Sequence, residues 1–154
     1  MHHQLRKQQR AIADAEAREL LQRGEYGILS TCGPDGQPYG IPLSYCLVDG
    51  AIYFHCAMAG HKLENLGADP RVSFCVVGKT EVLSEQFATR YESVVVFGRA
   101  VEVFEAEKQL ALEGLLAKYS PGYLVEGRRY IVAQAGQARV FRVAIDKISG
   151  KARR

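Results

Sequence analysis

The segment that decides the fold is residues 26–56, YGILSTCGPDGQPYGIPLSYCLVDGAIYFHC. It contains three runs rich in β-branched and aromatic residues, at about 26–32, 39–48 and 51–56, and such runs predict strands. Short turn signals separate the runs, PDGQ at 34–37 and DG at 49–50, and tight turns of this kind join antiparallel neighbours. The segment therefore predicts a three-stranded antiparallel meander.

The rest of the chain adds three strands and several helices. Apolar runs at 72–77, 93–104 and 138–145 predict strands, with a bulge or bend at Gly98 and a polar connection at 78–90. Helical patterns occupy 14–23, with Asp14 as N-cap and Gly24 as the stop, 60–68 and 105–118. The segment 121–134 is ambiguous, and we expect a helix in it from Tyr123.

Most of these strands follow one another directly, without the alternating helices of a parallel sheet. No Gly-x-Gly-x-x-Gly and no Walker motif occurs, so the two familiar parallel nucleotide-binding folds are disfavoured. The expected fold class is mainly β (α+β), a six-stranded antiparallel barrel with flanking helices.

Composition and charge disfavour several functional classes. The 154 residues suit one domain, no apolar run is long enough to span a membrane, and no secretion signal is evident. We therefore expect a cytoplasmic protein that does not bind membranes. The formal net charge is only +3, no nucleic-acid motif occurs, and the basic residues near the two ends suggest solvated tails. We expect no nucleic acid as a partner.

The cysteines and histidines do not suggest a disulfide framework or a metal site. Cys32, Cys46, Cys56 and Cys75 are widely spaced and lie in or beside apolar runs, which predicts free, buried thiols. A nucleophilic Cys56 beside His55 is disfavoured, because adjacent strand residues point to opposite faces. Two of the four histidines stand at the N-terminus, and no metal-ligand set is recognisable.

The segment IYFHCAMAGHKLENL, residues 52–66, predicts a strand, a loop of small residues and a helix that begins with His61 and Lys62. Cations are disfavoured at a helix N-terminus, where free N–H groups carry partial positive charge, unless an anion binds there. The pattern is typical of a phosphate site. The alternative interpretation is a surface helix that happens to begin with two basic residues.

Seven motifs occur in unbroken order along residues 14–154. They are ILST at 28–31, DGQPYGIPLSY at 35–45, IYFH at 52–55, GHKLENL at 60–66, DPRVSF at 69–74, YESVVVFGRA at 91–100 and ISGKAR at 148–153. Together they resemble the pyridoxamine-5′-phosphate-oxidase-related flavoproteins, and more closely the branch that contains the nitroimidazole-resistance (Nim-type) proteins. The resemblance implies a domain at 14–154 and leaves residues 1–13 as an N-terminal tail.

The resemblance implies a split β-barrel that binds FMN at the interface of a homodimer, with two flavin sites per dimer. Transferred by motif, the flavin-contact segment contains His55, His61 and Lys62, with Lys62 at the phosphate. The strand along the isoalloxazine contains Pro42, Leu43 and Ser44. Ser93 is implied to lie near the flavin of the second subunit, and the apolar strand 93–104 is the expected two-fold surface.

Two departures from the family pattern bear on function. The pyridoxamine-phosphate oxidases proper carry a C-terminal Trp and Arg pattern, whereas this chain contains no tryptophan, which argues against oxidation of pyridoxine phosphate. In the Nim-type branch, a cysteine often precedes the YESVVVFGRA motif at the position of Phe87.

The function implied is that of an FMN-dependent oxidoreductase, which passes electrons from a reduced nicotinamide, NADH or NADPH, to a small acceptor such as a nitro compound. The cofactor carries such chemistry, so no side chain is assigned as catalytic. The alternative is a non-catalytic flavin-binding or sensing module. His55 could equally be a strand histidine satisfied by a hydrogen bond, Tyr39 and Tyr91 are expected to pack, and Lys151 belongs either to the tail or to the flavin site.

Overall fold

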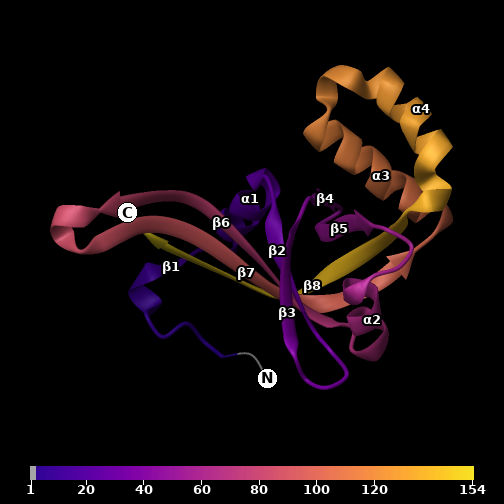
Figure 1. The fold of residues 1–154 in the computed structure, drawn as a ribbon. Coiled ribbons are helices and arrows are strands. Elements are labelled where there is room, and N and C mark those ends of the chain that lie inside the picture. The colour runs from indigo at the N-terminus through magenta and orange to yellow at the C-terminus, as the bar shows by residue number, and fades with distance from the viewer. Residues whose placement is uncertain (1–2) are drawn as a thin grey trace.

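The computed structural model describes residues 3–154 as an open antiparallel sheet surrounded by four α-helices (Figure 1). The sheet order is β3-β2-β6-β7-β8-β5-β4, and β1 pairs with β8 outside this path. The strands are β1 (Ala11–Ile12), β2 (Gly27–Cys32), β3 (Pro38–Leu43), β4 (Cys46–Val48), β5 (Ala51–Cys56), β6 (Arg71–Leu83), β7 (Ala88–Val103) and β8 (Arg139–Arg153). The helices are α1 (Asp14–Arg23), α2 (His61–Ala68), α3 (Glu105–Tyr119) and α4 (Leu124–Gln134).

The predicted fold class is confirmed, since β3 and β4 form two free edges and the sheet is a split barrel. The predicted number of six strands is wrong, because the described chain has eight. The expected strand 39–48 is two strands, β3 paired with β2 and β4 paired with β5. The break falls at Ser44 and Tyr45, where the fully buried Tyr45 ring packs edge-on against Phe74 and its hydroxyl donates to the carbonyl of Leu21.

The polar composition of segment 78–90 suggested a connecting loop, but the segment is part of the sheet. β6 and β7 continue through it as a long hairpin, which projects from the body of the molecule and which we call the arm (Figure 1). A short 3-10 turn, Ser84–Gln86, closes it, followed by Phe87 with φ of +49°. The two strands satisfy each other's main-chain groups, so polar side chains do not prevent pairing here.

The basic C-terminal residues are also part of the sheet. Lys151 pairs with Ser93 and Arg153 with Tyr91 across β7 and β8, so the prediction of a solvated tail is wrong for them. At the other end of the chain, Ala11 pairs with Lys151. The predicted irregularity at Gly98 is confirmed as a register shift between Phe97 and Gly98.

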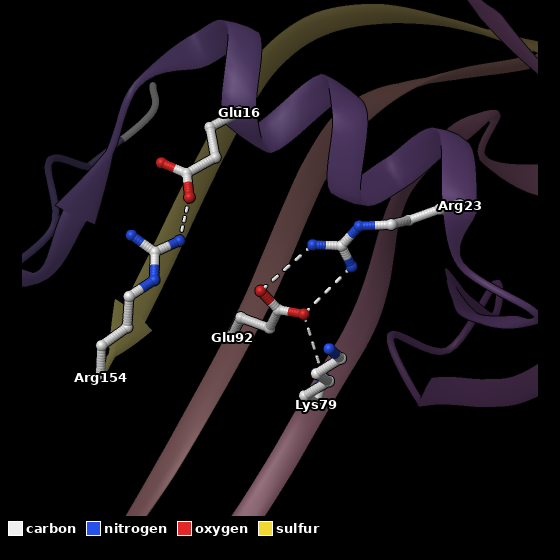
Figure 2. A network of polar contacts seen from close by, with 5 residues as sticks. All are labelled: Glu16, Arg23, Lys79, Glu92 and Arg154. Carbon is white, nitrogen blue, oxygen red and sulfur yellow. Dashed lines mark hydrogen bonds and ion pairs between the residues drawn. The ribbon is translucent and has the colours of Figure 1, made fainter.

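Helix α1 covers the sheet beside the arm (Figure 2). Asp14 is its first residue and not its N-cap, which is Ala13, although a carboxylate in the first turn still suits the helix dipole. Its buried residues are Ala17, Leu20 and Leu21. The helix ends at Gly24 as predicted, with the Gly24 N–H donating to the Leu20 carbonyl.

Two hydrophobic clusters stabilise the fold, and β8 contributes to both. Phe141 and Val143 belong to the large cluster, which also contains the buried face of α1. Val140, on the opposite face of β8, joins the smaller cluster under α3. All four cysteines are free thiols, as predicted, but the prediction that they are buried is correct for Cys46 alone, because Cys32, Cys56 and Cys75 are partly exposed. No helix within residues 3–154 is long and apolar enough to cross a membrane.

Candidate functional site

The strand, loop and helix predicted from residues 52–66 form as expected, with β5 leading into α2. Gly60 has φ of +149°, a conformation that glycine adopts without strain, and its carbonyl accepts the first helical hydrogen bond from Glu64, at 3.1 Å. By helix geometry, the N–H groups of His61, Lys62 and Leu63 have no carbonyl in a preceding turn. The start of α2 therefore offers main-chain donors to an anion.

A buried pair of side chains fixes α2 on the sheet. Nδ2 of Asn65 donates to Oγ1 of Thr31 at 3.0 Å, and both residues are buried. Because a buried polar pair is costly to break, it holds the start of the helix in one position.

His61 and Lys62 have different neighbours. The His61 ring stacks on Tyr39 of β3, with centroids 4.1 Å apart and planes inclined by 30°. Tyr39 is thus a packing aromatic, as predicted, and the ring that it packs against belongs to His61, a predicted site residue. Nζ of Lys62 lies 5.7 Å from the ring centroid of Phe54, on the β5 side.

His55 lies close enough to Lys62 for their charges to interact. Partial burial lowers the pKa of His55, and the positive charge of Lys62 lowers that pKa further. At neutral pH the imidazole is therefore uncharged and can both donate and accept a hydrogen bond. The pKa of Cys56 is raised by burial, against the opposing charge of Lys62, so its thiol is protonated and does not suit a nucleophile.

A cavity of about 850 Å³ lies between the end of β5 and helices α3 and α4. The sheet side of this cavity consists of Ser44, His55, Cys56 and Ala57. The helical side contributes aliphatic side chains of α3 together with Tyr119, Tyr123, Glu126 and Tyr130. Tyr123 and Tyr130 are 68% and 70% exposed, so the cavity opens to solvent at α4.

The two helices that cover this cavity approach each other closely at Gly127. A Cβ at that position would overlap the side chain of Leu116, so a larger residue would require that side chain to move. This contact explains why a glycine lies inside the helix that was expected from Tyr123.

The end of α3 is fixed to the break between β3 and β4. The Tyr119 hydroxyl accepts from the Tyr45 N–H at 3.0 Å and lies within hydrogen-bond distance of the carbonyls of Glu25, at 2.6 Å, and Tyr45, at 3.0 Å. The Lys118 ammonium donates to the Tyr45 carbonyl at 2.9 Å and sits 3.7 Å from the Tyr45 ring centroid. Ser44, the neighbour of Tyr45, is thereby held at the cavity wall.

The structure brings together most of the predicted site residues. Ser44 and His55 share the cavity wall, Lys62 is adjacent to His55, and His61 starts α2. Pro42 and Leu43 lie on β3, an edge strand, opposite Ile28 and Gly27 of β2.

Ser93 lies apart from this group within one chain. Ser93 pairs with Val77 of β6 and with Lys151 of β8. Val77 lies six residues along β6 from Arg71, the first residue of that strand after α2. At about 3.3 Å per residue, this separation is roughly 20 Å. Ser93 is therefore not among the residues that the structure gathers at the start of α2, and its contact with the flavin of a second chain stays a prediction from the resemblance.

The sequence interpretation assigned no role to the segment 121–134, which forms much of the cavity wall. A signal was available, because Tyr123, Gly127, Tyr130 and Gln134 recur at helical spacing and all line the cavity. Glu126, which shares that wall, was missed as well.

The family model described as pyridoxamine 5′-phosphate oxidase matches residues 13–152. None of the curated proteins compared with the chain matches it. Among solved structures, an FAD-binding protein from Mesorhizobium loti is similar, with 28% identity over 94% of this chain and 98% of that chain, and a TM-score of 0.71. The resemblance drawn from the seven motifs is confirmed.

Two further structures share the fold at lower identity. A candidate 5-nitroimidazole antibiotic resistance protein from Bacteroides thetaiotaomicron is 18% identical over 98% of this chain and 96% of that chain, with a TM-score of 0.74. The flavocytochrome Anf3 from Azotobacter vinelandii is 20% identical over 99% of this chain and 73% of that chain, with a TM-score of 0.82.

Proposed function

Because the chain belongs to the pyridoxamine 5′-phosphate oxidase family, we propose that it is an FMN-dependent oxidoreductase that passes electrons from a reduced nicotinamide to a small acceptor. The observation that carries the proposal is the start of α2, where free N–H groups and Lys62 adjoin a neutral His55 at the wall of a cavity. Nitro compounds are one candidate class of acceptor, in line with the description of the Bacteroides relative.

The residues present fit a phosphorylated flavin. Lys62 and the N–H groups of α2 would bind the phosphate, since a helix N-terminus and a lysine both favour an anion. Pro42, Leu43 and Ser44 belong to or follow an edge strand, whose outward main-chain groups can bond the polar edge of the ring. The neutral imidazole of His55 can donate a hydrogen bond to the ring.

When bound, the flavin would supply the redox chemistry, which is hydride transfer from the nicotinamide and electron transfer to the acceptor. The protein itself would bind and orient the flavin. Helices α3 and α4 form one wall of the cavity, and Tyr119 and Lys118 hold Ser44 in place through Tyr45. The free cysteines suit a reducing compartment such as the cytoplasm.

We propose further that the active unit is a homodimer with flavin at the subunit interface. The resemblance supports this, because it implies that Ser93, which does not line the cavity, lies near the flavin of the second subunit. β7 is hydrogen-bonded on both sides, to β6 and β8, so its edges are not available and an interface there must use its faces or the arm.

An equilibrium titration with FMN, FAD and riboflavin tests the cofactor. We expect about one FMN per chain, bound more tightly than riboflavin. The description of the Mesorhizobium relative as FAD-binding makes FAD the informative competitor. Tighter binding of FAD would correct the cofactor, and failure to bind any flavin would remove the proposal.

A second measurement separates an enzyme from the alternative, a flavin-binding or sensing module. Adding NADH or NADPH to the flavin-loaded protein without oxygen should bleach the flavin absorbance, and a nitroaromatic acceptor should restore it. Stable colour that neither nicotinamide bleaches would favour the binding module.

A further inference from the structure

We propose that the cavity between β5 and helices α3 and α4 is the acceptor site, and that it selects small aromatic molecules that carry no negative charge. This inference rests on the proposed function, because it assigns the acceptor of that same site. Of the residues implied to contact the flavin, Ser44 and His55 line this cavity, and the others do not.

The position of the cavity suits an acceptor. Its sheet wall contains Ser44 and His55, the two residues expected nearest the flavin ring, whereas Lys62 and His61 at the start of α2 do not line it. A molecule in the cavity would therefore lie beside the ring. Its volume of about 850 Å³ is within the usual range for a small-molecule site.

The charged side chains that line the cavity disfavour anions. Among the described residues, no lysine or arginine lines it, and Glu126 is the one lining carboxylate. His55 and Cys56 of the sheet wall are both uncharged at neutral pH.

Four cations near the cavity lie outside this lining. Lys62 acts on His55 and Cys56, and in the flavin-loaded protein it is assigned to the phosphate. Arg139 is paired with Glu102. The ammonium groups of Lys108 and Lys118 are bonded to the carbonyls of Ala138 and Tyr45.

The lining also favours flat apolar molecules. Tyr123 and Tyr130 present largely exposed rings at the opening, and the interior wall is formed by aliphatic side chains of α3 such as Leu112 and Leu115. Aromatic rings stack on tyrosine, and aliphatic walls exclude water from such a ligand. Phosphorylated pyridoxine is aromatic but anionic, so this cavity would reject it, in agreement with the absence of tryptophan from the chain.

The test uses three nitrobenzenes whose para substituents are neutral, anionic and cationic: 4-nitrobenzyl alcohol, 4-nitrobenzoate and 4-nitrobenzyl-trimethylammonium. Their dissociation constants are measured by calorimetry on the flavin-loaded protein, and kcat/KM is measured with a saturating nicotinamide. We expect the neutral and cationic compounds to bind roughly twofold to fivefold more tightly than the carboxylate, as one exposed charge such as Glu126 would produce.

Two variants assign this selectivity to the cavity. Glu126→Lys should weaken the cationic compound and strengthen the carboxylate, each by roughly fivefold to tenfold. Glu113→Lys, an exposed position on α3 outside the cavity, should leave all three constants unchanged. Equal binding of the three compounds, or equal effects of the two variants, would overturn the inference.

The design distinguishes failure of the inference from failure of the proposed function. If flavin binds and turns over without charge selectivity, the proposed function stands and the inference is wrong. If the compounds bind the flavin-free protein with the expected selectivity but no flavin binds, the cavity is confirmed and the proposed function fails. If FMN displaces the neutral compound competitively, the flavin itself fills the cavity and the acceptor site lies elsewhere.

Discussion

At the scale of single residues, the first turn of α2 separates two neighbouring basic side chains. The His61 ring stacks on Tyr39, whereas Lys62 lies near Phe54 and His55, where its ammonium charge can interact with a ligand. Lys62 is therefore the residue of this turn that should respond to the charge of a ligand.

We predict that Lys62→Ala weakens FMN by about one to two orders of magnitude, because one charge-assisted hydrogen bond contributes roughly 1.5–3 kcal/mol. Riboflavin lacks the phosphate, so its affinity should not change. Fluorescence titration of both flavins measures the difference, with Lys147→Ala on β8 as the control. An equal loss for both flavins would show that Lys62 is structural. In the same assay, His55→Ala should alter the flavin spectrum more than its affinity.

The second residue-scale prediction concerns Tyr119, whose hydroxyl satisfies the main-chain N–H of the fully buried Tyr45. Tyr119→Phe leaves that N–H without its partner and should lower the free energy of unfolding by about 1–3 kcal/mol. Denaturant unfolding measures the loss. Tyr123→Phe, a largely exposed tyrosine on the same side of the molecule, should stay within about 0.5 kcal/mol of the parent. A comparable loss in both variants would contradict the role given to Tyr119.

At the scale of elements, α1 is attached to the root of the arm by ion pairs (Figure 2). The Arg23 guanidinium donates two hydrogen bonds to the Glu92 carboxylate, at 3.0 and 3.2 Å, and the Lys79 N–H donates to Glu92 at 3.1 Å. Arg154 forms a second pair with Glu16 of α1. Residues of α1, β6 and β7 thus meet at the Glu92 carboxylate, and the end of the chain after β8 is attached to the same helix.

This attachment should make stability depend on pH. Arg23, and after it the Lys79 N–H, lower the pKa of Glu92 from its usual value of 4.5. A lowered carboxyl pKa means that the stabilisation is present above about pH 4.5 and is lost as the pH falls through the folded-state pKa. Glu92→Gln should therefore lower the free energy of unfolding by about 1 kcal/mol at pH 7, a small value because Arg23 is half exposed and solvent screens the pair. Below pH 4.5 the difference in unfolding free energy between the variant and the parent should shrink.

Thermal unfolding between pH 3 and pH 7 checks this dependence. Glu85→Gln, at the exposed tip of the arm, is the matched control and should show no such trend. A difference for Glu92→Gln that is constant over the whole range would mean that charge is not responsible.

At the scale of the whole molecule, the arm extends well away from the two hydrophobic clusters (Figure 1). It exposes large apolar side chains, with Phe87 98% and Val82 73% exposed. Phe87 also has φ of +49°, a conformation that is uncommon for a bulky residue and presents the side chain at the tip. Apolar groups placed in this way are expected to pack against another surface, and we assign that surface to the second copy of the proposed dimer.

We predict that Phe87→Asp shifts the dimer toward monomer, because it places a charge where an apolar ring would be buried. Light scattering over a concentration series measures the shift, and flavin affinity should fall with it if Ser93 completes the site of the partner. Val132→Asp makes the same chemical change at an 84% exposed position on α4 and should leave the dimer intact. The reverse result would place the interface on α4, and a parent protein that is monomeric with flavin bound would exclude the dimer.

The sequence by itself determined the features that depend on neighbouring residues. Tight turns at Gly36 and Gly50 predicted two hairpins, β2–β3 and β4–β5, although the two lie at opposite edges of the sheet and do not form the expected three-stranded meander. Alternating apolar residues predicted the strands, and the segment from Ile52 to Leu66 predicted the α2 site and, with the other motifs, the family. Turn chemistry and periodicity act over a few residues, so they can be read without the fold.

Only the tertiary structure decided the features that depend on contacts between distant segments. The break at Tyr45 arises because its side chain reaches Leu21 and its main chain is held by Tyr119, 74 positions away. The arm forms because polar segments on either side of Phe87 satisfy each other's main-chain groups. The helical wall of the cavity depends on the packing of α4 against α3, where Gly127 meets Leu116, and no local pattern specifies which helix a helix will pack against.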